Sequence, residues 1–173
     1  MPPDVTTRRE AIAFLRRHHA QPGAVEAAFA FDGDTGALLD FATGTLEAVE
    51  LDESKFQHCA NVAVLHSHPV NAAALQDDWQ YFLERNNQRE FIVVGPTASY
   101  FLAKPPDWVP NFQWRNSPYE DWGDHISNVL FEWGFSPLQL PTAEVWECAT
   151  VEVNVRMARQ YGLNFSWQSE EAS

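Results

Sequence analysis

The segment of residues 62–69, VAVLHSHP, constrains the fold more than any other part of the chain. Its apolar, β-branched start predicts a strand, and Pro69 ends this strand because proline cannot donate a ladder hydrogen bond. His66 and His68 lie two positions apart, so their side chains point to the same face of a sheet while Ser67 points away. We therefore expect two imidazoles side by side at the end of a strand.

The other hydrophobic patterns predict a mixed α+β domain. Apolar residues at helical spacing predict helices over residues 7–19, 75–86, 122–133 and 143–161. Period-two alternation between turn signals predicts strands over residues 24–31, 37–41, 91–94, 100–103 and 163–167, with residues 45–51 as an extension of the meander. The segment 143–161 also fits a strand, but it contains no helix breaker and Gly162 is a natural helix stop. We expect a largely antiparallel sheet flanked by helices.

Length and charge limit the class of protein. With 173 residues the chain fits one domain. Eleven Lys and Arg against 24 Asp and Glu give a net charge of −13, which argues against a nucleic-acid partner because phosphate backbones would be repelled. The polar start lacks the apolar region of a signal peptide, and no stretch reaches the ~18 apolar residues of a membrane span. We expect a cytoplasmic protein without a membrane partner, and export by a dedicated secretion system would leave the same sequence.

The paired histidines suit a divalent metal ion, most of all zinc, because neutral imidazole nitrogens are favourable zinc ligands. Asp77 and Asp78 follow about ten residues after His68, at the start of a predicted helix, where either carboxylate can supply a third protein ligand. Three protein ligands with water in the fourth position is the arrangement of a catalytic zinc. Acidic residues in a first helical turn also stabilise the helix dipole, and we assign that role to Asp77. The remaining histidines are expected to have no functional role: His18, His19, His58 and His125.

Residues 64–69, VLHSHP, followed by residues 75–79, LQDDW, resemble the JAB/MPN (JAMM) metallopeptidase family. The signature of that family is an upstream Glu, then His-x-His-Pro, about seven further residues, and Ser-x-x-Asp at the start of a helix. The resemblance is greatest to the JAB-type domains of bacterial polymorphic toxins. It rests there on Glu26 before Thr35-Gly36, the hairpin of residues 95–102 and the ending of residues 158–163. The resemblance implies an MPN-like (cytidine-deaminase-like) fold, with a core over about residues 20–105 and a C-terminal helical extension over about residues 106–168 of a single 1–173 domain.

The resemblance also implies a role for each residue of the motif. His66, His68 and Asp78 would bind the zinc ion, and Asp78 is preferred to Asp77 because the next residue, Trp79, begins the buried face of the helix. Glu26 would take a proton from the zinc-bound water and return it to the leaving amine.

Two departures from the family pattern bear on catalysis. The acid follows His68 by ten residues, where the family usually has eleven. The family Ser falls at Leu75, or at Gln76 when the loop is counted from His68. A Gln amide can donate a hydrogen bond to an oxyanion, whereas a Leu side chain cannot. Gln76 is therefore the candidate for that role.

Glu26 is also unusual for its surroundings. It interrupts the apolar segment VEAAF, where burying a carboxylate costs free energy unless the group is paired or has a role. The alternative is that Glu26 faces solvent on an edge strand. Glu47 and Glu50 are rival candidates for the general base, but both lie among polar residues and are expected to be solvated.

These features predict a zinc-dependent peptidase or isopeptidase that hydrolyses an amide bond in a protein or peptide substrate. The resemblance to toxin domains implies a bacterial toxin or effector, with a cognate inhibitor or immunity protein as a further partner. The alternative is an MPN-like protein-binding module, with or without metal, and the missing motif Ser favours it. A nuclease ranks third because of the negative charge. The substrate, the biological role and the oligomeric state are left open.

Overall fold

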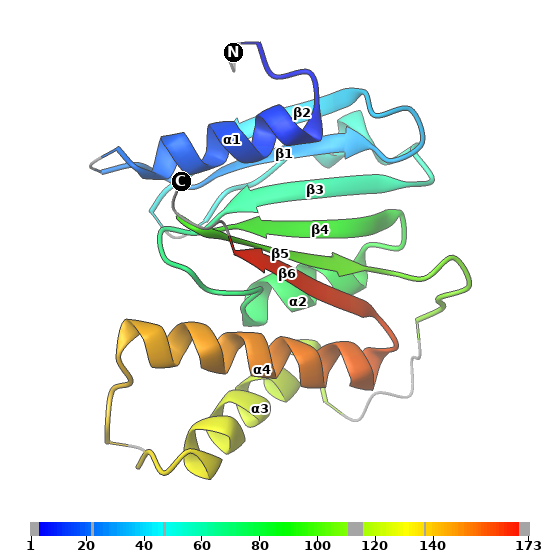
Figure 1. Ribbon diagram of the computed structural model, residues 1–173. Coiled ribbons are helices and arrows are strands. Elements are labelled where there is room, and N and C mark those ends of the chain that lie inside the picture. Colours follow the sequence, from blue (N-terminus) through cyan, green and yellow to red (C-terminus); the bar gives the residue numbers. More distant parts are fainter. Residues whose placement is uncertain (1–3, 22, 47, 111–115, 137, 170–173) are drawn as a thin grey trace.

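The computed structural model describes residues 4–21, 23–46, 48–110, 116–136 and 138–169. Within these residues six strands form one sheet in the order β2-β1-β3-β4-β5-β6 (Figure 1). The strands are β1 Ala27–Asp32, β2 Leu38–Thr43, β3 Val62–Ser67, β4 Gln88–Val94, β5 Ala98–Ala103 and β6 Asn164–Ser169. All neighbouring strands are antiparallel except β3 and β4, which are parallel. A mixed, mostly antiparallel α+β fold is therefore confirmed.

Helices cover both faces of this sheet (Figure 1). The four α-helices of the described residues are α1 Arg8–His19, α2 Gln76–Glu84, α3 Pro118–Glu132 and α4 Ala143–Tyr161, and a short 3-10 helix, η1, spans Glu53–Lys55. On one face, α1 packs against a cluster that includes Phe29 and Leu65. On the other face, α2, α3 and α4 share a larger cluster that includes Val64 and Val153. Because β3 is covered on both faces, all six of its residues are buried.

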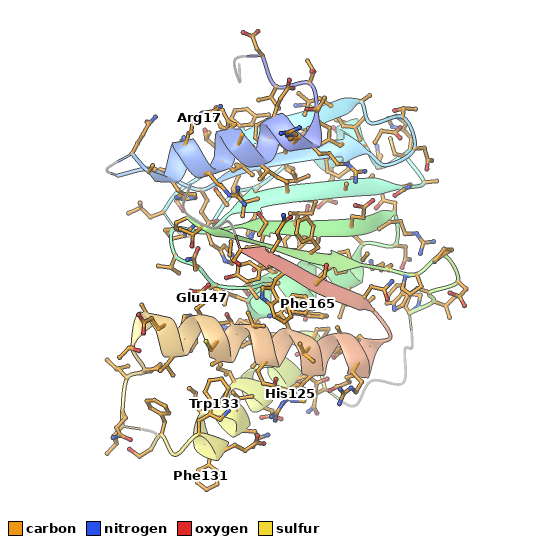
Figure 2. All side chains as sticks on the ribbon, viewed as in Figure 1. Arg17, His125, Phe131, Trp133, Glu147 and Phe165 are labelled. Carbon is orange, nitrogen blue, oxygen red and sulfur yellow. The ribbon has the colours of Figure 1, made fainter. Side chains whose placement is uncertain are left out.

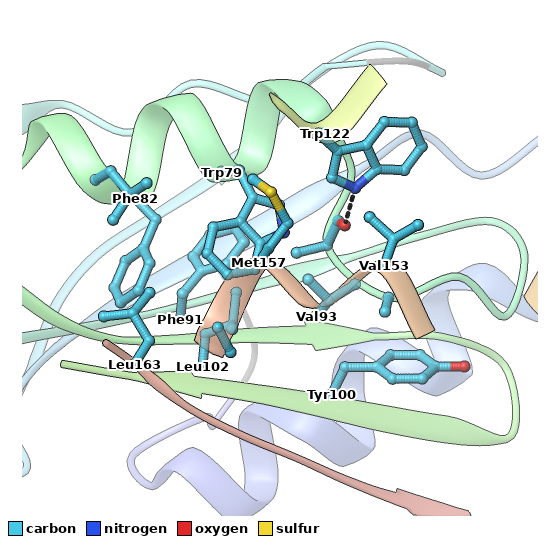
Figure 3. Packing of buried hydrophobic residues seen from close by; sticks show 14 of the residues in the cluster. Trp79, Phe82, Phe91, Val93, Tyr100, Leu102, Trp122, Val153, Met157 and Leu163 are labelled. Carbon is cyan, nitrogen blue, oxygen red and sulfur yellow. Dashed lines mark hydrogen bonds between the residues drawn. The ribbon is translucent and has the colours of Figure 1, made fainter. Parts of the chain in front are cut away.

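Helix α2 lies in the crossover connection between β3 and β4. Two parallel strands need such a connection, because the chain must return to the end of the sheet at which the first strand began. Trp79, Phe82 and Leu83 form its buried face. Figure 3 shows two of these side chains, Trp79 and Phe82, packed with Met157 of α4 and residues of β4 and β5. The burial of Trp79 fixes the rotation of α2 about its axis, and so fixes where its first turn points.

The helix boundaries follow from capping residues. Thr7 and Glu10 form a reciprocal capping box at the start of α1. The Thr142 side chain accepts a hydrogen bond from the Val145 N–H at the start of α4, and Gly162 ends that helix in the left-handed conformation at φ +67°. The helical interpretation of residues 143–161 is thus confirmed and the strand alternative is wrong.

One predicted extension of the sheet is wrong. In the described part of residues 45–51 there is no strand, because the Thr45 N–H donates to the Ala48 carbonyl at 2.7 Å and closes a turn. The segment instead forms a loop beside β1. The Thr45 carbonyl accepts a hydrogen bond from the Glu26 N–H at 2.6 Å, so the loop is anchored directly next to that residue.

The C-terminal segment shares its core with the rest of the domain. Val153, Met157 and Leu163 belong to the same hydrophobic cluster as Val64 and Trp79, and β6 pairs with β5 at the edge of the sheet. The boundary between a core of residues 20–105 and an extension of residues 106–168 stays a prediction. On the outer side of α3 the Phe131 side chain projects away from the sheet (Figure 2). In the part of the chain described, every helix is too short or too polar to cross a bilayer.

Candidate metal centre

The end of β3 places two imidazoles together. His66 is the second-last residue of β3, and His68 directly follows the strand. The two residues are 8% and 5% exposed. Their ring centroids are 4.6 Å apart. Ser67 points to the opposite side, where its hydroxyl accepts a hydrogen bond from the Ala27 N–H at 3.0 Å. The predicted alternation of these three side chains is confirmed.

Asp78 brings a carboxylate to the same point from the first turn of α2. Its Oδ1 lies 3.3 Å from Nε2 of His66, and its Oδ2 lies 3.3 Å from Nε2 of His68. The Leu75 N–H also donates to Oδ2 at 2.7 Å, which fixes the carboxylate at the helix N-terminus. One ligand atom from each of the three residues lies within 4.8 Å of the others. Asp77, by contrast, is exposed and is not part of this group of ligand atoms, although it lines the same cavity.

The donor atoms fit a zinc ion. His68 directs Nδ1 to the Ala72 carbonyl at 3.2 Å, so Nδ1 carries the proton and the lone pair of Nε2 faces the cluster. Nε2 of His66 is buried and makes no hydrogen bond with any described residue. A buried nitrogen of this kind costs free energy unless something binds it. Two imidazole nitrogens and one carboxylate are a common donor set for zinc.

The pKa values of His66 and Asp78 are shifted toward their metal-binding protonation states, whereas the pKa of His68 is shifted the other way. Burial lowers the pKa of His66 to about 4, although Asp78 opposes this. Burial also acts to lower the pKa of His68, but the charge of Asp78 and, more weakly, that of Glu26 outweigh it, so the pKa is raised. Burial disfavours the Asp78 carboxylate, yet the two histidines lower its pKa to about 2. At neutral pH Asp78 is therefore ionised and His66 is neutral.

Glu26 lies just before β1 and is 7% exposed. Both of its backbone groups are hydrogen-bonded to the same neighbouring segment. The Glu26 N–H donates to the Thr45 carbonyl, and the Glu26 carbonyl accepts from the Gly44 N–H at 2.8 Å. Strand β1 lies between β2 and β3, so the alternative of a solvent-facing Glu26 on an edge strand is wrong. The residue lines the same cavity as the three candidate ligands, and its charge acts on His68.

This cavity has a volume of about 540 Å³, which is large enough for part of a peptide. The candidate ligands and Glu26 form its polar side. Glu50, one rival for the general base, lies exposed on its lining, and Glu47, the other rival, lies outside the described residues. The rest of the lining is mainly apolar and includes Leu46, Val49, Leu51, Val64, Val70, Leu75, Tyr81 and Phe91.

The structure does not bring Gln76 to this site. Its side-chain N–H donates to the Tyr119 hydroxyl at 2.8 Å, and Gln76 is not among the described residues that line the cavity. Leu75 occupies the N-cap of α2, three positions before Asp78, and it does line the cavity. Of the two candidates for the motif Ser position, Leu75 therefore lies at the cavity and Gln76 does not.

Two histidines that we had set aside contact the backbone of the site from the α1 side. His18 donates from Nε2 to the carbonyl of Val25, next to Glu26, at 2.9 Å. His19 lies near the backbone of Ser67, between the two candidate ligands. The prediction that they have no role missed these contacts, because no sequence signal indicates that the last turn of one helix meets the ends of two strands.

No family model, curated protein or solved structure matches this chain. The His66, His68 and Asp78 cluster and its cavity are therefore the features of this chain from which a function can be inferred.

Proposed function

We propose that this chain is a zinc-dependent hydrolase of the JAB/MPN type that cleaves an amide bond in a protein or peptide. The observation that carries the proposal is the convergence of His66, His68 and Asp78 at the wall of a cavity, with a buried His66 nitrogen that makes no hydrogen bond with any described residue. A structural cluster would have its polar atoms completed by the protein itself.

The arrangement of elements supports an MPN-like assignment. The two histidines end a strand, the acid lies in the first turn of the crossover helix that follows, and Glu26 precedes the antiparallel neighbour of that strand. This order of residues on this order of elements is what the resemblance to the family predicts. A toxin or effector role with a cognate inhibitor belongs to the proposal through the same resemblance.

A bound zinc ion would polarise the amide carbonyl and lower the pKa of a water in its open position. The chain's own residues prepare for this chemistry. Asp78 is ionised and His66 is neutral at neutral pH, so neither needs to lose a proton before it binds a metal, whereas the raised pKa of His68 means that this residue must release one when it is protonated. The Glu26 carboxylate, buried on the cavity wall, accepts the proton of the attacking water and returns it to the departing amine.

One observation favours a second function. Leu75 lies where the family has Ser, and an alkyl side chain cannot donate a hydrogen bond to a developing oxyanion. The second candidate is therefore an MPN-like protein-binding module that retains the metal cluster without turnover. Retention of Glu26 in a buried position beside the cluster favours the hydrolase, because a binding module has no need of a general base there.

Metal analysis of paired variants tests the proposal. Protein purified without chelator should contain about one zinc per chain, and Asp78→Ala should reduce that content strongly. Asp77→Ala is the matched control, since it removes the neighbouring carboxylate of the same helical turn and should keep the zinc. The reverse ranking of the two variants would contradict the ligand assignment, and equal zinc in all three proteins would contradict the site.

A further inference from the structure

The cavity beside the candidate metal centre has an apolar wall that reaches its rim. Leu46 and Val70 are 62% and 51% exposed, although both are large apolar side chains. Leu51, Leu75 and Tyr81 continue this wall toward the interior. Apolar side chains exposed together on a concave surface are a feature of sites that bind another apolar group.

The charge of the cavity has one sign. Its described lining contains four carboxylates, and none of these lining residues is Lys or Arg. A divalent ion would offset the charges of Glu26 and Asp78. Glu50 and Asp77 would keep their negative charge toward solvent, because both are exposed and neither makes an ion pair within the described part of the chain.

From these two features we propose that the site selects an amide next to an apolar side chain, in a segment that is neutral or positively charged. This inference rests on the proposed function and specifies its substrate. An acidic residue in the cavity would approach both Glu50 and Asp77, and like charges in a partly apolar site repel more strongly than in bulk water.

Binding of small hydroxamates to the zinc-loaded protein tests this selectivity without a known substrate. The probes are the hydroxamates of N-acetyl-leucine, N-acetyl-glutamine and N-acetyl-glutamate, the last with a free side-chain carboxylate. The glutamine and glutamate probes have nearly the same size and differ in charge. We expect the leucine probe to bind most tightly and the glutamine probe to bind about tenfold more tightly than the glutamate probe.

Paired variants locate the cause of the discrimination. Glu50→Gln with Asp77→Asn should bring the ratio of glutamine to glutamate affinity close to one. Asp124→Asn with Glu144→Gln removes the same charge from exposed positions on α3 and α4 and should leave the ratio unchanged. Higher salt should also reduce the ratio in the wild-type protein.

The outcomes separate this inference from the proposed function. Protein that takes up no zinc overturns the proposed function and this inference with it. If the zinc-loaded protein binds no hydroxamate, the proposal of an open position at the metal and the proposal of selectivity are both overturned. Zinc-loaded protein that binds the glutamine and glutamate probes equally, or prefers glutamate, overturns the selectivity alone.

Discussion

Two buried polar clusters lie on the same side of the sheet, and they differ in whether the protein completes their hydrogen bonds. In the first, Asn154 of α4 accepts from the Trp79 indole N–H at 3.0 Å and donates to the Ala74 carbonyl at 2.8 Å and to the Thr150 carbonyl at 2.8 Å. In the second, Nε2 of His66 makes no hydrogen bond with any described residue. The first cluster is complete, and the second has room for a ligand.

The two clusters are joined through the start of α2 and the short loop before it. Asp78 and Trp79 are adjacent on α2 and belong to different clusters. The loop before α2 is held by α3 and α4, since Thr150 accepts from the Ala73 N–H at 3.1 Å and Trp122 donates to the Ala74 carbonyl at 3.2 Å (Figure 3). The complete cluster therefore positions the incomplete one, because it fixes the loop that sets the distance between His68 and Asp78.

The largest effect is expected from breaking the incomplete cluster. His66→Ala combined with His68→Ala removes both imidazole donors and should weaken zinc binding by at least ~10³-fold, given the free energy that each ligand typically supplies. A zinc competition titration measures this. Near-UV circular dichroism in the presence of chelator should show that the variant is still folded. Wild-type zinc affinity in the folded variant would mean that the metal binds elsewhere.

A smaller effect separates catalysis from binding at the same cavity. Glu26→Gln keeps the size of the side chain and removes the proton acceptor, so turnover of an amide substrate should fall by ~10²–10⁴-fold. Zinc content should not change, because Glu26 is not among the three candidate ligands. A steady-state assay on the zinc-loaded variant tests this, and full activity of that variant would exclude Glu26 as the general base.

Breaking the complete cluster should change stability instead. Asn154→Ala leaves the Trp79 N–H without its partner in the core and removes one of the two donors to the Ala74 carbonyl, which should lower the free energy of unfolding by about 1–3 kcal/mol. Urea denaturation measures the change. Asn128→Ala, at an exposed position of α3, is the matched control and should change little. The folded Asn154→Ala protein should still bind one zinc ion. A folded variant that binds no zinc would mean that the Asn154 cluster is part of the metal site.

The smallest effect concerns protons released when zinc binds. His68 has its pKa raised above 6.5, whereas His66 titrates at about 4 and Asp78 at about 2. Between about pH 4 and 6.5 only His68 holds a proton, so zinc displaces one proton. Zinc affinity should therefore rise about tenfold per pH unit in this window and level off above the pKa of His68. Competition titrations at several pH values measure the slope, and a hundredfold rise per unit would mean that both imidazoles are protonated.

Most elements of the fold were predictable because their signals are local. The apolar, β-branched run before Pro69, the Thr7 cap of α1 and the Gly162 end of α4 each act within a few residues. The extension of the meander over residues 45–51 was wrong for a related reason. A turn closed by Thr45 and Ala48 competes with strand pairing, and alternation of residue types does not report that competition.

The candidate ligands were predictable in part. The spacing of His66 and His68 was sufficient to place both imidazoles on one face, since strand geometry leaves no alternative. Asp78 needed the burial of Trp79 to be chosen over Asp77, and Gln76 was misplaced because the N-cap of α2 is Leu75. The N-cap of α2 is Leu75, whose side chain cannot accept a capping hydrogen bond. The sequence therefore contains no capping signal that would show where α2 begins after the shortened loop.

The sequence by itself determined which side chains share a face, because the periods of strands and helices are properties of the backbone. It also determined the acidity of the chain and the polar character of the His66, His68 and Asp78 set. Only the tertiary structure decided that these three residues meet, that Glu26 is buried beside them, and that His18 and His19 contact the strand ends from behind. Those distances join residues far apart in the chain, and they depend on how the helices pack against both faces of the sheet.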